Sequence, residues 1–209
     1  MAKAGFLLFF TLFTALTIWG QESNFPYNEG FEAAFTTGTD VTFIPNWTGN
    51  EVATTNRIFQ GSDARTGSAS LNIIPTSTFQ GEILLALDLS SLNLAKISFH
   101  AFSKQNGAGT STRPVLLNIA TSIDGGATFL DDVAVGDATT FPNDNTTSYT
   151  QYEYSLPVQA GNEAQVIVRL TAQRGEGSGS AAELVIDDFV VEEQVLPLAI
   201  SEVEATNAT

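Results

Sequence analysis

Apolar and polar residues alternate with a period of two along five stretches of this chain, and a sixth stretch is a β-branched apolar run. These stretches are 82–89, 96–102, 115–123, 151–156, 165–173 and 184–191. That period is typical of β-strands, whose successive side chains point to opposite faces of a sheet. After Gly20 no stretch carries the capped apolar stripe that an amphipathic helix needs. The pattern therefore predicts an all-β protein.

Clusters of Gly, Asn, Asp and Pro separate these stretches and indicate turns. They lie at 107–109, 124–126, 142–145, 161–162 and 175–180. Several of the predicted strands carry apolar residues on both faces, as expected when two sheets stack and loops cover part of the outside. The sequence therefore predicts a two-sheet antiparallel β-sandwich of the jelly-roll type, concanavalin-like or galactose-binding-like, over residues 21–194.

The first 20 residues have the layout of a secretory signal peptide. Lys3 precedes an apolar run from Ala4 to Trp19, and the small residue Gly20 and a polar segment follow. The alternative is a membrane anchor, but the run is shorter than the roughly 20 residues that span a bilayer. We expect cleavage after Gly20, no membrane span in the mature chain, and a bacterial protein that is secreted or held at the cell surface.

The last 15 residues, 195–209, differ in character from the predicted sandwich. Val195–Leu198 forms a short apolar link, and the small, polar segment Ser201–Thr209 follows. We interpret 195–209 as a linker, or as the start of a further domain that continues beyond residue 209.

Composition excludes several classes of function. The chain has 8 Lys and Arg against 23 Asp and Glu, a net charge of −15, which argues against nucleic acid or anionic lipid as a partner. It has no cysteine, which excludes disulfides, thiolate metal sites and cysteine nucleophiles. The single histidine, His100, leaves no second histidine for a His-rich zinc site.

Calcium is the cation that this composition favours. A secreted protein without disulfides needs another source of stability, and carboxylates are the ligands that Ca²⁺ prefers. Asp187 and Asp188 interrupt a Val/Ile/Phe strand, so at least one carboxylate must face a buried side. A buried carboxylate is paired or bound to a metal. The alternative is that both aspartates accept hydrogen bonds from loop amides or pair with Arg65.

Four motifs follow one another along the chain. They are NEGFE at 28–32 with Trp47 further on, DARTGSASL at 63–71, ATSIDGGATF at 120–129 and IDDFVV at 186–191. In this order they resemble the MAM-like, cleaved-adhesin ("choice-of-anchor J") jelly-roll domains of secreted Bacteroidetes proteins, and the resemblance covers roughly residues 24–193.

The resemblance implies a concanavalin-like sandwich, frequent structural calcium, and an adhesive or carbohydrate-binding accessory role. In related jelly rolls a first-strand Glu and a last-strand Asp share a calcium site at one edge, closed by the loop before the second motif. Carried over to this chain, the implied ligands are Glu32, Asp63, Ser68 or a carbonyl near Arg65, and Asp187 or Asp188.

Aromatic and planar polar side chains are the candidates for contact with a sugar. They are Trp47, Arg113, Tyr149, Tyr152 and Tyr154. Trp47 has the alternative role of capping the core beneath a loop. Tyr152 and Tyr154 share one strand face, and alternation alone does not decide whether that face is core or groove.

No catalytic constellation stands out in the chain. His100 has no Gly-x-Ser-x-Gly elbow to work with. A glycosidase needs two carboxylates at set spacing, and only Glu153 or Glu183 meeting another acid would supply them. We therefore expect a secreted, non-catalytic adhesion or carbohydrate-binding module, stabilised by calcium, with a glycan or cell-surface ligand as partner. The alternatives are a structural spacer beside other modules and a polysaccharide hydrolase.

Overall fold

The computed structural model describes residues 20–33, 40–41, 44–50, 57–77 and 80–196. The described strands form two sheets, which we call sheet I and sheet II. Sheet I runs in the order β10 (Thr150–Ser155), β7 (Ala95–Lys104), β12 (Glu183–Glu193), β5 (Ser70–Ile73), β4 (Ile58–Gly61), and β1 (Tyr27–Glu29) also pairs with β12. Sheet II runs in the order β2 (Asp40–Val41), β3 (Trp47–Asn50), β6 (Gly81–Leu87), β11 (Val166–Arg174), β8 (Val115–Ser122), β9 (Val133–Val135).

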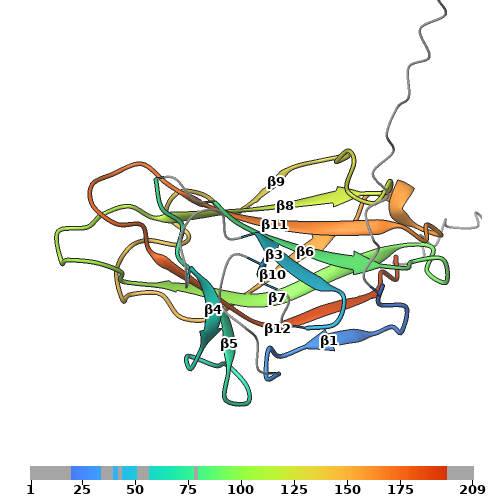
Figure 1. Ribbon diagram of the computed structural model, residues 1–209, viewed down its shortest axis with the longest axis horizontal. Helices are drawn as coiled ribbons and strands as arrows, with labels where there is room; N and C mark the ends of the chain where they lie inside the picture. Colours follow the sequence, from blue (N-terminus) through green and yellow to red (C-terminus); the bar gives the residue numbers. More distant parts are fainter. Residues whose placement is uncertain (1–19, 34–39, 42–43, 51–56, 78–79, 197–209) are drawn as a thin grey trace, which may run out of the picture.

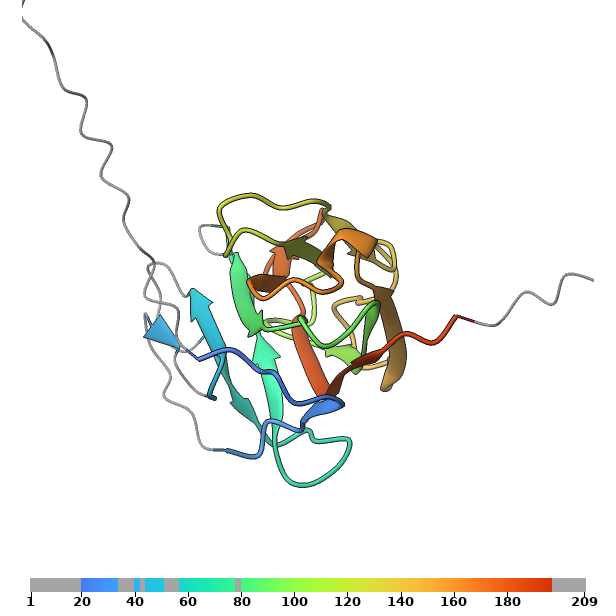
Figure 2. The ribbon, with the colours of Figure 1, turned by 90° about the vertical axis from the view of Figure 1, so that its right-hand side faces the viewer.

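The two sheets lie face to face, and every pairing between these strands is antiparallel (Figures 1 and 2). Strands β7, β10 and β12 lie in one layer, and β6, β8 and β11 lie in the other. One short 3₁₀ turn, Val158–Ala160, follows β10. The predicted two-sheet antiparallel jelly-roll sandwich is confirmed.

The five alternating stretches correspond to the long strands β6, β7, β8, β10 and β11, and the β-branched run corresponds to β12. The predicted turns fall between strands, as expected. The alternation missed the other strands because each has only two to four residues, too few to display a period.

The core lies between the inner faces of the sheets, but β12 is buried on both faces for much of its length. Leu184 and Ile186 point into the core, and Val185 and Asp187, on the other face, are also fully buried. The β4–β5 loop, residues 62–69, hydrogen-bonds to Asp187 on this outer face. Because the loop covers this outer face, apolar residues occur on both faces of β12, and its sequence is a nearly continuous apolar run.

The predicted signal peptide, apart from Gly20, and residues 197–209 of the tail lie outside the described residues. Just after Gly20, Glu22 forms an isolated bridge with Leu87, and its N–H donates to the Ala86 carbonyl at 3.0 Å. Over the described part of the chain, no helix has the length and apolar character to cross a membrane. The domain limits at 21 and 194 stay a prediction.

Trp47 is part of the core, so its predicted contact with a sugar does not suit its position. Only 2% of its surface is exposed, and its Nε1 donates to the Tyr27 hydroxyl at 2.6 Å. Its ring meets those of Phe31 and Phe189 edge to face, at centroid distances of 5.7 and 5.0 Å. An indole enclosed in this way presents no face to a ligand, and the alternative role in the core is the one that the structure supports.

Replacing Trp47 by Ala should therefore cost stability through the lost packing and the cavity left behind. We expect the free energy of unfolding to fall by about 3–5 kcal/mol, measured by urea denaturation. The control is Leu130→Ala, whose side chain is 44% exposed and should change stability by less than about 0.5 kcal/mol. Equal effects of the two substitutions would contradict the core placement of Trp47.

Candidate functional site

A β-bulge in β12 places two successive carboxylates against the β4–β5 loop. The register of β12 against β7 shifts between Asp187 and Val190, and Asp188 adopts a φ of 48°. Positive φ is unfavourable for residues other than glycine, and bulges re-aim side chains that would otherwise alternate. As a result Asp187 and Asp188 both reach Arg65 and Thr66 of the loop.

Asp187 is the anchor of the loop. Its Oδ2 accepts hydrogen bonds from the backbone N–H groups of Arg65 and Thr66, at 2.7 and 3.1 Å, and its Oδ1 accepts one from Asp188 N–H at 2.7 Å. The residue is 0% exposed. Burial raises the pKa of its carboxyl group above the ordinary value, and the three N–H donors oppose that rise.

Asp188 holds the side chains of the same two loop residues. Its Oδ2 accepts a hydrogen bond from Arg65 Nη1 at 2.6 Å, in a salt bridge, and its Oδ1 accepts one from the Thr66 hydroxyl. Partial burial acts to raise the pKa of Asp188, but the Thr66 and Arg65 donors outweigh it, and the pKa lies below the ordinary value.

Glu32 holds the far end of the loop. Its carboxylate accepts hydrogen bonds from Ser68 N–H at 3.0 Å, the Ser68 hydroxyl at 2.8 Å and Ala69 N–H at 3.0 Å. The Ser68 N–H is the main cause of a lowered pKa for Glu32. The approach is close because Gly67 has a φ of 69°, and a Cβ there would lie 2.3 Å from Glu32 Oε1.

Tyr149 and Lys104 fasten the start of the loop. The Tyr149 hydroxyl donates to the Asp63 carbonyl oxygen at 2.5 Å, and the Tyr149 ring packs edge to face on Phe102. Lys104 Nζ donates to the Asp63 carboxylate at 2.5 Å. Tyr149 therefore positions the loop and does not stand out as a sugar platform.

The fastened loop forms one wall of an open pocket of about 490 Å³. Ser62, Asp63, Ser68 and Ala69 are its lining residues from the loop, and Gly61 of β4 adjoins them. The other lining side chains are Glu32, Phe59, Gln60, Asn72 and Lys104.

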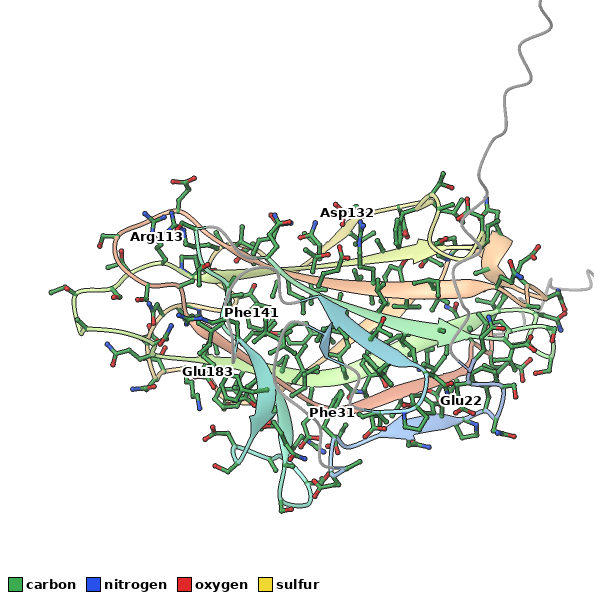
Figure 3. All side chains as sticks on the ribbon, viewed as in Figure 1. Glu22, Phe31, Arg113, Asp132, Phe141 and Glu183 are labelled. Carbon is green, nitrogen blue, oxygen red and sulfur yellow. The ribbon has the colours of Figure 1, made fainter. Side chains whose placement is uncertain are left out.

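A buried polar network lies beneath this pocket. Asn72, which is fully buried, accepts a hydrogen bond from the Ser70 hydroxyl at 2.8 Å and donates one from Nδ2 to Glu183 Oε1 at 2.5 Å. Glu183 is 8% exposed and pairs with Lys104 Nζ at 3.0 Å. Figure 3 shows Glu183 beside the β4–β5 part of sheet I. Together with the Lys104–Asp63 bond, the network joins β5, β12 and β7 to the loop.

Room for the Asn72 amide comes from Gly61 on the neighbouring strand β4. The two strands pair in register, with Gly61 opposite Ser70. A Cβ at Gly61 would lie 2.2 Å from Asn72 Oδ1, so only glycine accommodates the amide in this position.

The structure brings the predicted calcium ligands to one region, but it does not arrange them as a metal site. The predicted residues Glu32, Ser68, Asp187 and Asp188 all take part in holding the loop, and Asp63 pairs with Lys104. Within the described part of the chain, no group of three or more His, Asp or Glu side chains is placed to hold a metal ion.

The donor groups explain this poor fit to calcium. Backbone N–H groups and the Arg65 guanidinium, which repel a cation, already occupy the oxygens of Asp187 and Asp188. This arrangement matches the alternative raised from the sequence, in which both aspartates bind loop amides and Arg65. Calcium at this edge stays a prediction.

Two of the predicted sugar-binding tyrosines lie on the core face of β10. Tyr154 is 8% exposed, and its hydroxyl bonds to Asp131 and Thr121. Tyr152 packs against Phe99 and Phe141, with centroids 5.8 and 5.4 Å apart. Both rings pack within the core, so this face of β10 does not form the sugar-binding groove that was one of the two alternatives.

Arg113 is not among the residues that line the pocket, and its side chain lies against the 175–180 loop (Figure 3). Its Nε and Nη1 donate to the carbonyl oxygens of Gly179 and Gly175, at 3.1 and 3.0 Å. The guanidinium therefore fastens the 175–180 loop, and the predicted role in ligand binding does not suit this position.

The two glutamates considered for glycosidase chemistry each share a lysine with another acid, Glu183 with Asp63 at Lys104 and Glu153 with Glu192 at Lys96, but they do not meet each other. Glu183 pairs in register with Lys104 of β7, whereas Glu153 lies opposite Ser98, six residues away along the same strand. That spacing corresponds to about 20 Å. The separation far exceeds the 5–10 Å or so that glycosidase carboxylates require.

The sequence analysis missed Phe59, Gln60, Asn72 and Lys104. β4 and β5 are too short to show alternation, so nothing marked the first three as pocket residues. Asn72 between Leu71 and Ile73 did carry a usable signal, because a polar amide inside an apolar strand needs partners when it is buried.

No protein-family model matches the chain. No curated protein matches it either. Several solved structures are similar to it. The CBM22-1 xylan-binding domain of Xyn10C from Paenibacillus barcinonensis has 13% identity and a TM-score of 0.48 over 81% of this chain and 95% of that domain.

Two further similar structures come from other bacteria. The K3 cleaved adhesin domain of Lys-gingipain from Porphyromonas gingivalis has 13% identity and a TM-score of 0.48 over 79% of this chain and 96% of that one. The C-terminal family 22 carbohydrate-binding module of Xyn10B from Clostridium thermocellum has 16% identity and a TM-score of 0.47 over 80% and 91%. Likenesses this distant assign no ligand to the chain.

Removing the loop anchor should both destabilise the protein and release the loop. In Asp187→Ala the N–H groups of Arg65, Thr66 and Asp188 lose their acceptor, and we expect unfolding free energy to fall by about 2–4 kcal/mol. Trypsin should then cut the native protein after Arg65. Asp132→Ala, an acid on the opposite sheet (Figure 3), is the control. A variant as stable and protease-resistant as the parent would contradict the anchoring role.

Chelation separates the two interpretations of the carboxylates. With the loop held by protein donors, the melting temperature should be the same in EDTA as in millimolar Ca²⁺, measured by calorimetry. A resident calcium ion at 100 times its Kd would add about 2.7 kcal/mol, and its removal would lower the melting temperature by several degrees. A drop of that size would restore the calcium prediction.

Proposed function

We propose that the chain is a non-catalytic carbohydrate-binding module of a secreted or surface protein, and that the pocket under the β4–β5 loop holds the glycan. The observation that carries the proposal is the lining of this pocket, to which the aromatic residue Phe59 contributes together with Asn72, Asp63 and Glu32.

This lining suits the chemistry of a sugar ring. A pyranose has an apolar C–H face, which an aromatic ring covers, and an edge of hydroxyl groups, which carboxylates and amides bind. The volume of about 490 Å³ lies within the range of roughly 300–1,000 Å³ that is usual for small-ligand pockets. An open pocket of this size would take one or two sugar units and leave the rest of a chain in solvent.

The pocket is also held in shape before a ligand arrives. The loop wall is fixed through Glu32, Asp187 and Asp188, and the floor is fixed by the bonds from Asn72 to Glu183. Groups that are ordered in advance lose little entropy on binding, which favours affinity from few contacts.

The state of the pocket carboxylates supports binding without catalysis. A glycosidase general acid needs a pKa raised toward neutrality. Loop N–H donors lower the pKa of Glu32 instead, and Asp63 is engaged by Lys104. The resemblance of the sequence motifs to cleaved-adhesin domains implies the same kind of accessory role.

A structural spacer is the second candidate. Val195 and Leu196, directly after β12, are 82% and 58% exposed, and a neighbouring element would cover them. A spacer would leave the pocket without a ligand, so saccharide binding distinguishes the two candidates.

Titration calorimetry with a panel of neutral oligosaccharides tests the proposal. For whichever member binds, Phe59→Ala should weaken affinity by about tenfold or more, because it removes the ring under the sugar. Phe129→Ala is the matched control, since this ring is also half-buried but lies against Arg169 of sheet II, and it should not change affinity.

Two outcomes would contradict the proposed function. One is that no saccharide binds, whether neutral, acidic or amine-bearing, which would favour the spacer. The other is that Phe59→Ala and Phe129→Ala weaken binding equally, which would place the ligand elsewhere. Circular dichroism of both variants shows that the fold is intact.

A further inference from the structure

Carboxylates outnumber cationic groups around the pocket. Two carboxylates, Glu32 and Asp63, and a single ammonium group, Lys104, line it. A third carboxylate, Glu183, lies directly behind Asn72 in the buried network. The pocket and its floor therefore carry three negative charges against one positive charge, in a chain of net charge −15.

The one cation among the lining side chains is already paired. Lys104 Nζ lies between Asp63 and Glu183, at 2.5 and 3.0 Å. Two of its three N–H donors are used in these pairs, and its positive charge is already offset by two carboxylates, one of them on Glu183, which is 8% exposed.

The guanidinium of the β4–β5 loop is paired as well. Arg65 belongs to the same loop, but its Nη1 is held by Asp188 at 2.6 Å, on the side of the loop that faces β12. A uronate or sulfated sugar entering the pocket would therefore meet two carboxylates and, among the lining side chains, one cation whose charge two carboxylates already offset.

From these contacts we infer that the affinity of the pocket for a saccharide depends on the charge that the saccharide carries. Sugars with a protonated amine bind most tightly, uncharged sugars less tightly and uronates least. The inference rests on the proposed function, and it adds the class of glycan to it. Its physical basis is that like charges placed in one pocket cost affinity and opposite charges add to it.

The test uses two matched sets of short oligosaccharides at pH 7 and low salt. One set holds β-1,4-linked trimers of glucosamine, glucose and glucuronate, and the other holds galactosamine, galactose and galacturonate. In the set that binds, affinity should rise about tenfold from uronate to neutral sugar, and should rise again from neutral sugar to amine. Because salt screens charges over a few ångströms at 1 M, both steps should shrink in 1 M NaCl.

Two variants locate the effect in the pocket. Asp63→Asn removes one lining charge while its side-chain oxygen can still accept from Lys104, so the ratio between neutral and uronate affinities should fall at least threefold. Asp132→Asn makes the same change in net charge on the opposite sheet (Figure 3), and should leave the ratio as it is.

Each failure has a separate meaning. If no member of either set binds, the proposed function fails. If neutral sugars bind but uronates bind equally well or better, the charge ranking is overturned and glycan binding stands. If Phe59→Ala still binds the amine trimer as the parent does, that binding is general attraction to an acidic protein, and the ranking is overturned too.

Discussion

The carboxylate of Asp187 is the interaction on which the rest of the site depends. It is buried on the outer face of β12, and it accepts N–H groups from Arg65 and Thr66 of a loop that is more than 100 residues away in sequence. Without this acceptor, the N–H groups of Arg65 and Thr66 would lose their hydrogen-bond partner, and the loop would lose the contact that holds it over β12. Because of the bulge, Asp188 directs a second carboxylate to Arg65 and Thr66 and holds their side chains.

The pocket is a consequence of this anchoring. Once the middle of the loop is held over β12, its two ends form a wall beside β4 and β5, and the wall encloses Phe59 and Asn72. The buried bonds from Asn72 through Glu183 to Lys104 then fix the floor and decide the charge of the cavity. Glu32 belongs to both features, because it holds the loop at Ser68 and also lines the pocket.

The sequence predicted the long strands and the burial of an Asp in β12, because periodicity and the Asp pair are local signals. It did not predict β4, β5 or the pocket residue Phe59, since strands of four residues are too short to display a period. The sequence left open whether Tyr152 and Tyr154 face the core or a groove. In the structure both lie on the core face, where Tyr152 packs against Phe99 and Phe141. Calcium was expected because carboxylates gather in sequence, but loop amides and Arg65 are their partners in the structure.

The most direct test of a loop-walled glycan pocket is a titration of the ¹⁵N-labelled protein with an amine-bearing trisaccharide, followed by amide chemical shifts. The account predicts that the largest shifts cluster at Phe59 and Gln60 of β4 and at Ser68 and Ala69 of the loop, with sheet II unchanged. Shifts centred on the outer face of sheet II, or none at saturating sugar, would contradict it.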